Sequence, residues 1–441
     1  MEDVYIITGG KPLRGEVILS GAKNVALKTI IAALMFNAEV ILENVPRIND
    51  VFELLHLIKL IGGKAEFVDK NTVAINGKEI KTNKVDLLHS SKIRASFMLF
   101  APLLAKFKEC YVPNPGGCRI GARPIDRIVE GMKSIGLSVE YDHQTGYYKA
   151  QINKRLSGHY RFVKSSHTGT ELLILIGLLG NDKVVLENAA LEPEIDELIK
   201  FLNMSGGEIK RDGTKIIIHP VKKLMQKQPF KIISDRNEAV TYATLALATR
   251  GEISISEIPY ELIKSFSDKV KTVGGGFADL NRERYKFFYQ GELKASIIET
   301  LPHPGFMTDW QPNWAVLMSQ AKGESIIHER VFENRFSYVD ELRKLGAEID
   351  YIKIPVTNPV EYFFFNFDPA KKYNQAIRIN GPQQFHSGVL TVADLRAGAS
   401  LAIAAFIAQG ESVINGASIL DRGYEDFVKK TQSLGGEISR L

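Results

Sequence analysis

One pattern repeats six times along the 441 residues of this chain. Each copy has an apolar helical stretch, a strand, a second helical stretch and a glycine before the next strand, as in "KLIGGKAEF" and "QSLGGEISR". A glycine at the end of a helix favours the left-handed backbone, which other residues adopt at a cost. The repeat glycines, 68 to 89 residues apart, are Gly62, Gly136, Gly206, Gly274, Gly346 and Gly435.

The strand after the first helix is also recognisable in most copies. In these segments apolar and polar residues alternate, which predicts half-buried strands. The segments lie at residues 38–46, 182–191, 251–259, 323–332 and 410–419.

Six units predict two α/β domains of three units each. The repeats are longer than the 20 to 50 residues typical of solenoids, so closed globules are expected rather than an open array. The polar, lysine-rich stretch 222–232 is the expected seam, and residues 4–19 could pair with either half. A cleft between two similar halves is a common place for a small-molecule site.

Composition excludes several classes of protein. Hydrophobic residues make up 45% and charged residues 24%, as in ordinary globular proteins. The N-terminus "MEDVYIITGG" reaches glycines before any long apolar run, so we expect no signal peptide, no membrane anchor and a cytoplasmic protein. The net charge of +5 is spread over 56 cations and 51 anions, which argues against nucleic-acid binding and suits a local pocket for anionic small molecules.

The two cysteines have different surroundings. They are too few for a disulfide framework, and no Cys/His cluster has metal-ligand spacing, so no metal site is expected. Cys110 reads as a structural strand residue. Cys118 lies in the loop "NPGGCRIGARP", where Arg119 and Arg123 favour the thiolate and the glycines allow the loop to close.

Charged residues recur where the apolar helices begin. A helix N-terminus favours phosphate or carboxylate, and cations at matching repeat positions predict a shared anion site, although any one alone would be an ordinary surface residue. The residues at these positions are Lys23, Asn24, Arg94, Asp394 and Arg396, with Arg335 and Arg422 in nearby loops.

The motifs together resemble a known family. "SGAKN", "PGGCRIGARP", "NAALEPEI", "TDWQ", "VFENRF", "DLRAGAS" and "DRGYE" occur in the order seen in the UDP-N-acetylglucosamine enolpyruvyl transferases, over nearly the whole chain. The resemblance implies an α/β fold of two inside-out α/β barrel domains, each of three repeated units. The implied domains are 21–229, carrying the cysteine loop, and 1–20 plus 230–441.

The resemblance also implies an activity. The family transfers the enolpyruvyl group of phosphoenolpyruvate to the 3-hydroxyl of UDP-N-acetylglucosamine and releases phosphate through a tetrahedral ketal, with no metal or organic cofactor. This is the first committed step of peptidoglycan synthesis, and so of cell-wall biogenesis, cell shape and cell division. The implied partners are these two small molecules, with no nucleic acid or membrane. The expected state is a monomer, with a weak oligomer as the alternative.

Residue roles follow from the matched motifs. Lys23, Arg123 and Arg422 would bind phosphoenolpyruvate, and Asp309 would be the base near the attacking hydroxyl. Cys118 would be the general acid and the residue that fosfomycin alkylates. The implied catalytic set is Cys118, Asp309, Lys23 and Arg396. The residues implied for UDP-N-acetylglucosamine are Asn24, Arg94, Arg123, Pro124, Ile125, Asp126, Thr168, Gly169, Asp309 and Val331, with Arg335 and Asp394 lining the cleft.

The chain departs from the family at several positions. Arg119 adds charge beside the thiol, and His167 replaces a serine at the nucleotide phosphates; Asn49 and Ala393 are also unexpected residue types. The largest difference is the aromatic segment 351–380, which predicts either an extra hairpin or a contact surface for another chain.

Two alternative functions stay open at this stage. The first is a sister enolpyruvyl transferase acting on shikimate 3-phosphate or on a nucleotide such as UMP; the cysteine loop argues against shikimate 3-phosphate. The second is a non-catalytic paralogue that binds a UDP-sugar. A protein that only binds has no need of an acid and a base, so the intact Cys118 and Asp309 argue against it.

Overall fold

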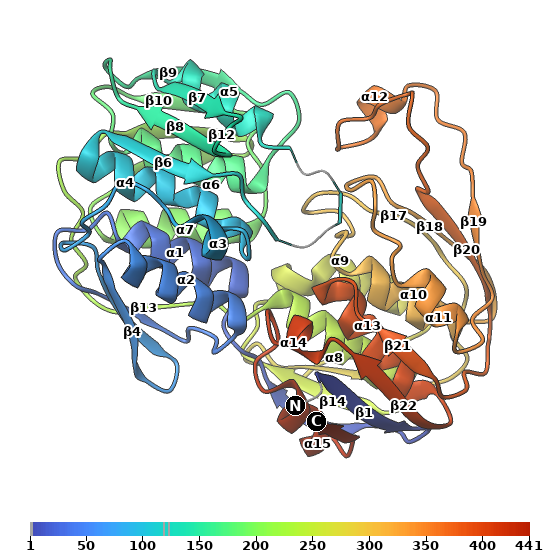
Figure 1. The fold of residues 1–441 in the computed structure, drawn as a ribbon. Coiled ribbons are helices and arrows are strands. Elements are labelled where there is room, and N and C mark those ends of the chain that lie inside the picture. The colour runs from blue at the N-terminus through green and yellow to red at the C-terminus, as the bar shows by residue number, and fades with distance from the viewer. Residues whose placement is uncertain (1–2, 118–119, 122–123) are drawn as a thin grey trace. The chain divides into compact units, whose positions relative to one another are not determined.

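The computed structural model describes residues 3–117, 120–121 and 124–441. Within this part the chain divides into two compact units, which are described separately (Figure 1). Unit 1 contains residues 3–20, 120–121 and 234–441, and unit 2 contains residues 21–117 and 124–233.

Unit 2 is built from three sheets. Two have four strands and one has three. The strands are β3 (Val40–Glu43), β4 (Lys64–Asp69), β5 (Thr72–Asn76), β6 (Glu109–Pro113), β7 (Ser138–Asp142), β8 (Tyr147–Gln151), β9 (Gly158–Arg161), β10 (Val184–Glu187), β11 (Glu208–Asp212), β12 (Lys215–His219) and β13 (Phe230–Lys231). The helices are α1 (Lys23–Ala33), α2 (Asn49–Leu60), α3 (Leu87–Ser90), the 3-10 helix η1 (Arg94–Leu99), α4 (Phe100–Phe107), α5 (Asp126–Ser134), α6 (His167–Gly177) and α7 (Pro193–Met204).

Unit 1 contains three four-stranded sheets. The strands are β1 (Val4–Gly9), β2 (Arg14–Ile18), β14 (Glu252–Ser256), β15 (Gly276–Asp279), β16 (Tyr285–Phe288), β17 (Ile297–Glu299), β18 (Gly323–His328), β19 (Ile349–Ile352), β20 (Ala376–Gly381), β21 (Val389–Thr391), β22 (Gly410–Asn415) and β23 (Glu437–Arg440). The helices are α8 (Arg236–Ala248), α9 (Tyr260–Thr272), α10 (Gln311–Ser319), α11 (Val339–Arg343), α12 (Pro359–Tyr362), α13 (Leu395–Ile407), α14 (Ala417–Leu420) and α15 (Phe427–Ser433).

The sheets share one pairing scheme. In each four-stranded sheet one edge strand pairs in parallel with its neighbour, and the other two strands continue antiparallel, as in the order β17-β18-β20-β19. The three-stranded sheet β6-β8-β7 keeps the scheme, because a parallel bridge between Lys84 and Tyr111 stands where the other sheets have their parallel edge strand. The predicted repeat therefore corresponds to one sheet with its helices.

The repeat glycines have the predicted conformation. All six follow shortly after a helix and have φ between 86° and 107°. A side chain would be strained in this left-handed region, so glycine lets each helix end and the chain turn into the next strand.

Two strands, β2 and β13, pair in the unit other than the one to which the next helix in sequence belongs. β2 precedes α1 in sequence but pairs in parallel with β14 in unit 1, and β13 precedes α8 but pairs in parallel with β3 in unit 2. The sequence-based division lies at 229/230, whereas unit 2 continues to residue 233 because of this β13 pairing.

The helices form the core of unit 1. Every residue of α8 and α10 is buried, as is nearly every residue of α13, and these three helices pack on one another. The sheets lie outside them (Figure 1). Because such helices are covered on all sides, their polar first turns must be satisfied inside the protein. Three predicted site residues lie there: Asp309 just before α10, and Asp394 and Arg396 at the start of α13.

The segment 351–380 forms the long connection between β19 and β20. The aromatic rings pack on one another, with the Phe363 ring 5.0 Å from that of Phe365 and the Phe365 ring 5.2 Å from that of Tyr373. Phe363 and Phe365 are buried. The aromatic residues thus form a small core of their own. Between β19 and β20 the chain has the short helix α12 and no strand, so the expected extra hairpin is not formed.

None of the helices in the described part of the chain is both long and apolar enough to cross a membrane.

Candidate active site

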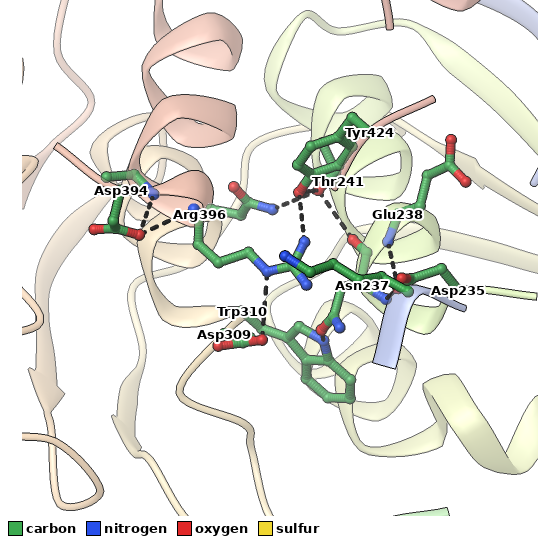
Figure 2. Close-up of polar contacts among 12 residues, drawn as sticks. Asp235, Asn237, Glu238, Thr241, Asp309, Trp310, Asp394, Arg396 and Tyr424 are labelled. Atoms are coloured by element: carbon green, nitrogen blue, oxygen red, sulfur yellow. Dashed lines mark hydrogen bonds and ion pairs between the residues drawn. The ribbon is translucent and has the colours of Figure 1, made fainter. Parts of the chain in front are cut away.

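The first turns of α8, α10 and α13 lie together in unit 1 (Figure 2). Asp235 begins α8 and accepts the N–H of Asn237 at 2.7 Å, and Asp394 begins α13 and accepts the N–H of Arg396 at 3.0 Å. At the start of α10, the indole N–H of Trp310 donates to Asn237 Oδ1 at 3.0 Å. These contacts place three helix N-termini around one polar cluster.

Asp309 lies between two buried arginines. Arg335 Nη2 is 2.7 Å from Asp309 Oδ1. Arg396 Nε is 3.3 Å from Asp309 Oδ2, a contact that Figure 2 shows. Arg335 also pairs with Asp394, at 3.4 Å. The arginine side chains are 2% and 7% exposed, whereas that of Asp309 is 24% exposed. Within this cluster, the carboxylate of Asp309 is therefore more accessible than either arginine.

Tyr424 completes the surroundings of Arg396. Arg396 Nη1 donates to the Tyr424 hydroxyl at 3.2 Å, and that hydroxyl is 2.8 Å from Thr241 Oγ1. Burial by itself would lower the pKa of the Arg396 guanidinium, but Tyr424 and Asp309 raise it. The guanidinium is thus permanently charged and fixed in direction, as anion recognition requires.

Lys23 is the first residue of α1 in unit 2, as predicted from the sequence. The Nζ atom of Lys23 is 2.5 Å from Asp50 Oδ2 on the first turn of α2, and the two side chains are 12% and 7% exposed. The helix has no side-chain cap at its start. Asn24, the next residue, is half-buried.

Arg94 and Arg422 are half-buried, in unit 2 and unit 1 respectively. Arg94 begins η1, so the predicted apolar helix starts as a 3-10 turn before α4. Arg422 lies between α14 and α15.

The residues predicted for the nucleotide lie at the starts of α5 and α6. Ile125 is buried at the start of α5, and the flanking Pro124 and Asp126 are exposed. Thr168 is half-buried in the first turn of α6, where the next residue, Gly169, donates its N–H to Ser166 Oγ at 3.2 Å.

His167 pairs with a buried carboxylate. His167 Nε2 is 3.1 Å from Glu171 Oε1, and Lys28 Nζ is 3.4 Å from Glu171 Oε2. Burial by itself would lower the pKa of His167, but Glu171 outweighs this and raises it. The unexpected histidine therefore belongs to a charge network in unit 2.

Val331 is half-buried in the loop after β18, and its N–H donates to Glu329 Oε1 at 2.8 Å.

Cys118, Arg119 and Arg123 lie outside the described residues, so their predicted roles stay predictions. In the described part of the chain, no group of three or more His, Cys, Asp or Glu side chains is placed to hold a metal ion.

Of the predicted residues, the structure joins Asp309, Arg335, Asp394 and Arg396 in direct contact. Sequence reasoning missed Glu329 and Tyr424, which lie near these residues in unit 1, and Asp50, the partner of Lys23 in unit 2. Tyr424 lies within the "DRGYE" motif and Asp50 follows a residue noted as unusual, but no signal in the sequence pointed to Glu329.

Comparison with solved structures defines the class of protein. The enolpyruvyl transferase NikO from Streptomyces tendae superposes with a TM-score of 0.85, at 20% identity over 99% of this chain and 98% of that one. EPSP synthase from Acinetobacter baumannii superposes with a TM-score of 0.73, at 17% identity over the full length of both chains. At these identities the similarity establishes the fold, which is the α/β fold of enolpyruvyl transferases.

Sequence comparison establishes the family. The family model for EPSP synthase (3-phosphoshikimate 1-carboxyvinyltransferase) matches residues 7–431. A UDP-N-acetylglucosamine 1-carboxyvinyltransferase of Thermodesulfovibrio yellowstonii is 36% identical over the whole of both chains, and one of Bartonella henselae is 35% identical over 100% of this chain and 99% of its own. The chain belongs to the UDP-N-acetylglucosamine 1-carboxyvinyltransferases, within the enolpyruvyl transferase family. The predicted resemblance and fold class are confirmed.

Asp394 is expected to stabilise unit 1 in two ways that can be separated by mutation: by capping α13 and by pairing with the charge of Arg335. Asp394→Asn keeps a capping side chain but removes the charge beside Arg335, whereas Asp394→Ala removes both. We expect Asn to destabilise unit 1 and Ala to destabilise it by about 1 kcal/mol more. Both tryptophans of the chain, Trp310 and Trp314, lie in unit 1, so denaturation followed by tryptophan emission reports on this unit.

Asp340→Ala is the matched control. The Asp340 side chain is 74% exposed and pairs with Arg343 within α11, so its loss is expected to cost less than about 1 kcal/mol. If Asp394→Asn and Asp394→Ala were equally destabilising, the capping role would be contradicted. If Asp394→Asn were as stable as the wild type, the stabilising role of the charge pairing with Arg335 would be contradicted.

Proposed function

We propose that this chain transfers the enolpyruvyl group of phosphoenolpyruvate to the 3-hydroxyl of UDP-N-acetylglucosamine and releases phosphate. The observation that carries the proposal is the full-length identity of 34 to 36% to relatives with the corresponding name. This identity favours the sugar nucleotide over shikimate 3-phosphate or UMP as the acceptor. The reaction is the first committed step of peptidoglycan synthesis. We propose that it takes place in the cytoplasm and that the enzyme acts as a monomer.

The chemistry needs a base and an acid at opposite ends of one double bond. The acceptor oxygen attacks C2 of phosphoenolpyruvate as its proton leaves, and a second proton is added to C3, which gives a tetrahedral ketal. Loss of a C3 proton and of phosphate then restores the double bond in the product. In our proposal Asp309 accepts the hydroxyl proton and Cys118 donates the proton to C3.

The geometry of Asp309 supports its part in this proposal. Its carboxylate is held by two arginines that are buried and that stay charged, while the carboxylate itself is partly exposed. A carboxylate fixed in this way can orient a hydroxyl without reorganising during the reaction. Arg396, whose guanidinium is fixed by Tyr424 as well, would stabilise the negative charge that develops nearby.

Two anionic substrates require several fixed cations. We propose that Lys23, Arg123 and Arg422 bind the phosphate and carboxylate of phosphoenolpyruvate, because guanidinium and ammonium groups keep their charge at working pH. Arg335 and Asp394 hold the surrounding cluster in place. The residues we propose for UDP-N-acetylglucosamine are Asn24, Arg94, Arg123, Pro124, Ile125, Asp126, Thr168, Gly169, Asp309 and Val331.

The direct test compares acceptors. Phosphate release from phosphoenolpyruvate is measured with UDP-N-acetylglucosamine, UMP and shikimate 3-phosphate in parallel. We expect release with UDP-N-acetylglucosamine alone. Release with either other acceptor, or with none of the three, would contradict the proposed function.

A second test concerns the two thiols. Fosfomycin should alkylate Cys118 and not Cys110, because Cys110 is fully buried in β6 and burial raises the pKa of its thiol. UDP-N-acetylglucosamine should accelerate the labelling by closing the loop. Mass spectrometry identifies the modified residue, with Cys118→Ser as the control that should remain unlabelled. Label on Cys110 would overturn the assignment.

A further inference from the structure

Glu329 is a buried carboxylate whose two oxygens contact different loops of unit 1. The residue has no exposed surface and follows the last residue of β18. Oε1 accepts the backbone N–H groups of Val331 at 2.8 Å and Phe332 at 3.1 Å. Oε2 accepts the hydroxyl of Thr308 at 2.9 Å. One side chain therefore connects the 331–332 segment to the turn that carries Asp309.

The link to the second loop extends to the helix that follows it. Gln311, the first residue of α10, approaches Glu329 Oε2 through its Nε2 at 3.5 Å. Because Thr308 and Gln311 lie on either side of Asp309 in sequence, the turn that presents Asp309 is held to Glu329 from both sides.

The other side of the 329–332 segment is fixed by the aromatic connection between β19 and β20. Gln375 Nε2 donates to the carbonyls of Glu329 at 2.9 Å and Phe332 at 3.1 Å. The Arg330 guanidinium lies 3.7 Å from the centre of the Tyr362 ring, and the Phe364 N–H donates to the Arg330 carbonyl at 2.8 Å. The segment is therefore held on both sides and has little freedom to shift.

Burying the Glu329 carboxylate costs free energy, because the charged group loses its hydration. A carboxylate without exposed surface loses its hydration, and burial raises the pKa of Glu329 despite the hydrogen bonds from Val331 and Phe332 and the charge of Arg335. A glutamine, which is neutral and of similar size, would avoid this cost, but its amide has one accepting oxygen where the carboxylate has two.

We propose that Glu329 is a positioning residue for acceptor binding: by joining the Thr308 turn to the 331–332 segment, it fixes the spacing of Asp309 and Val331. This inference rests on the proposed function, in which Asp309 and Val331 both contact UDP-N-acetylglucosamine. Glu329 itself has no exposed surface and does not touch substrate.

The test breaks the same link from each end. Glu329→Gln replaces one accepting oxygen by a donating amide, and Thr308→Val removes the hydroxyl at nearly constant volume. Each is expected to raise KM for UDP-N-acetylglucosamine by about tenfold or more, since each removes a hydrogen bond to a charged group. KM for phosphoenolpyruvate should stay within about twofold. Because both changes remove one interaction, the double variant should be no worse than the more severe single variant.

Glu238→Gln is the matched control. Glu238 is another buried glutamate of unit 1, and its carboxylate accepts the Ser20 N–H at 2.7 Å and Lys430 Nζ at 2.6 Å, both far in sequence from the 308–309 turn and the 331–332 segment. It should lower the melting temperature without an acceptor-specific change in KM. Amide hydrogen exchange supplies a readout independent of activity: the Val331 and Phe332 amides should lose protection in Glu329→Leu, which removes both accepting oxygens, and keep it in Glu238→Gln.

The outcomes separate the two proposals. If the wild type does not release phosphate with UDP-N-acetylglucosamine, the proposed function fails, whatever the exchange data show. If the wild type is active but the variants change both KM values equally or act additively, or if Glu329→Leu leaves Val331 and Phe332 protected, the positioning role of Glu329 is overturned and the proposed function stands.

Discussion

The interaction on which the rest of unit 1 depends is the pairing of two buried guanidinium groups with carboxylates at the starts of α10 and α13. Arg335 and Arg396 are almost inaccessible to water, and an unpaired charge in that position would cost several kcal/mol. Asp309 and Asp394 can pair with these arginines only if α10 and α13 keep their positions relative to each other. The charges that suit the cluster to an anionic substrate are thus the same charges that specify how the central helices pack.

The fold makes such a cluster possible because it puts helices inside and sheets outside. Helix N-termini normally face solvent, where water satisfies their amides. In unit 1 the first turns of α8, α10 and α13 meet inside the protein, where the carboxylates of Asp235 and Asp394 accept backbone amides of α8 and α13 in place of water. Three copies of one supersecondary unit therefore bring three partly positive helix ends together, and the carboxylates of Asp235 and Asp394 cap two of them.

Local signals made much of this predictable from the sequence. The repeat glycines mark helix ends because a left-handed φ requires glycine, and Lys23 and Asp394 stand at helix starts because an apolar run follows directly. Interactions between distant segments were not predictable in this way. Asp309 pairs with residues 26 and 87 positions away, β2 and β13 pair outside the repeats they precede, and Glu329 has no motif of its own. The 351–380 segment also needed three-dimensional information, because exposed and self-packed aromatic residues have the same composition.

The proposed function depends on Asp309 as the group that accepts the proton of the acceptor hydroxyl. The most direct measurement is the kcat of Asp309→Ala from phosphate release, together with the dissociation constant for UDP-N-acetylglucosamine from calorimetry. We predict that kcat falls by about 100-fold or more, while the dissociation constant changes by less than about tenfold, because the carboxylate acts mainly as the proton acceptor. A kcat close to that of the wild type would contradict the account.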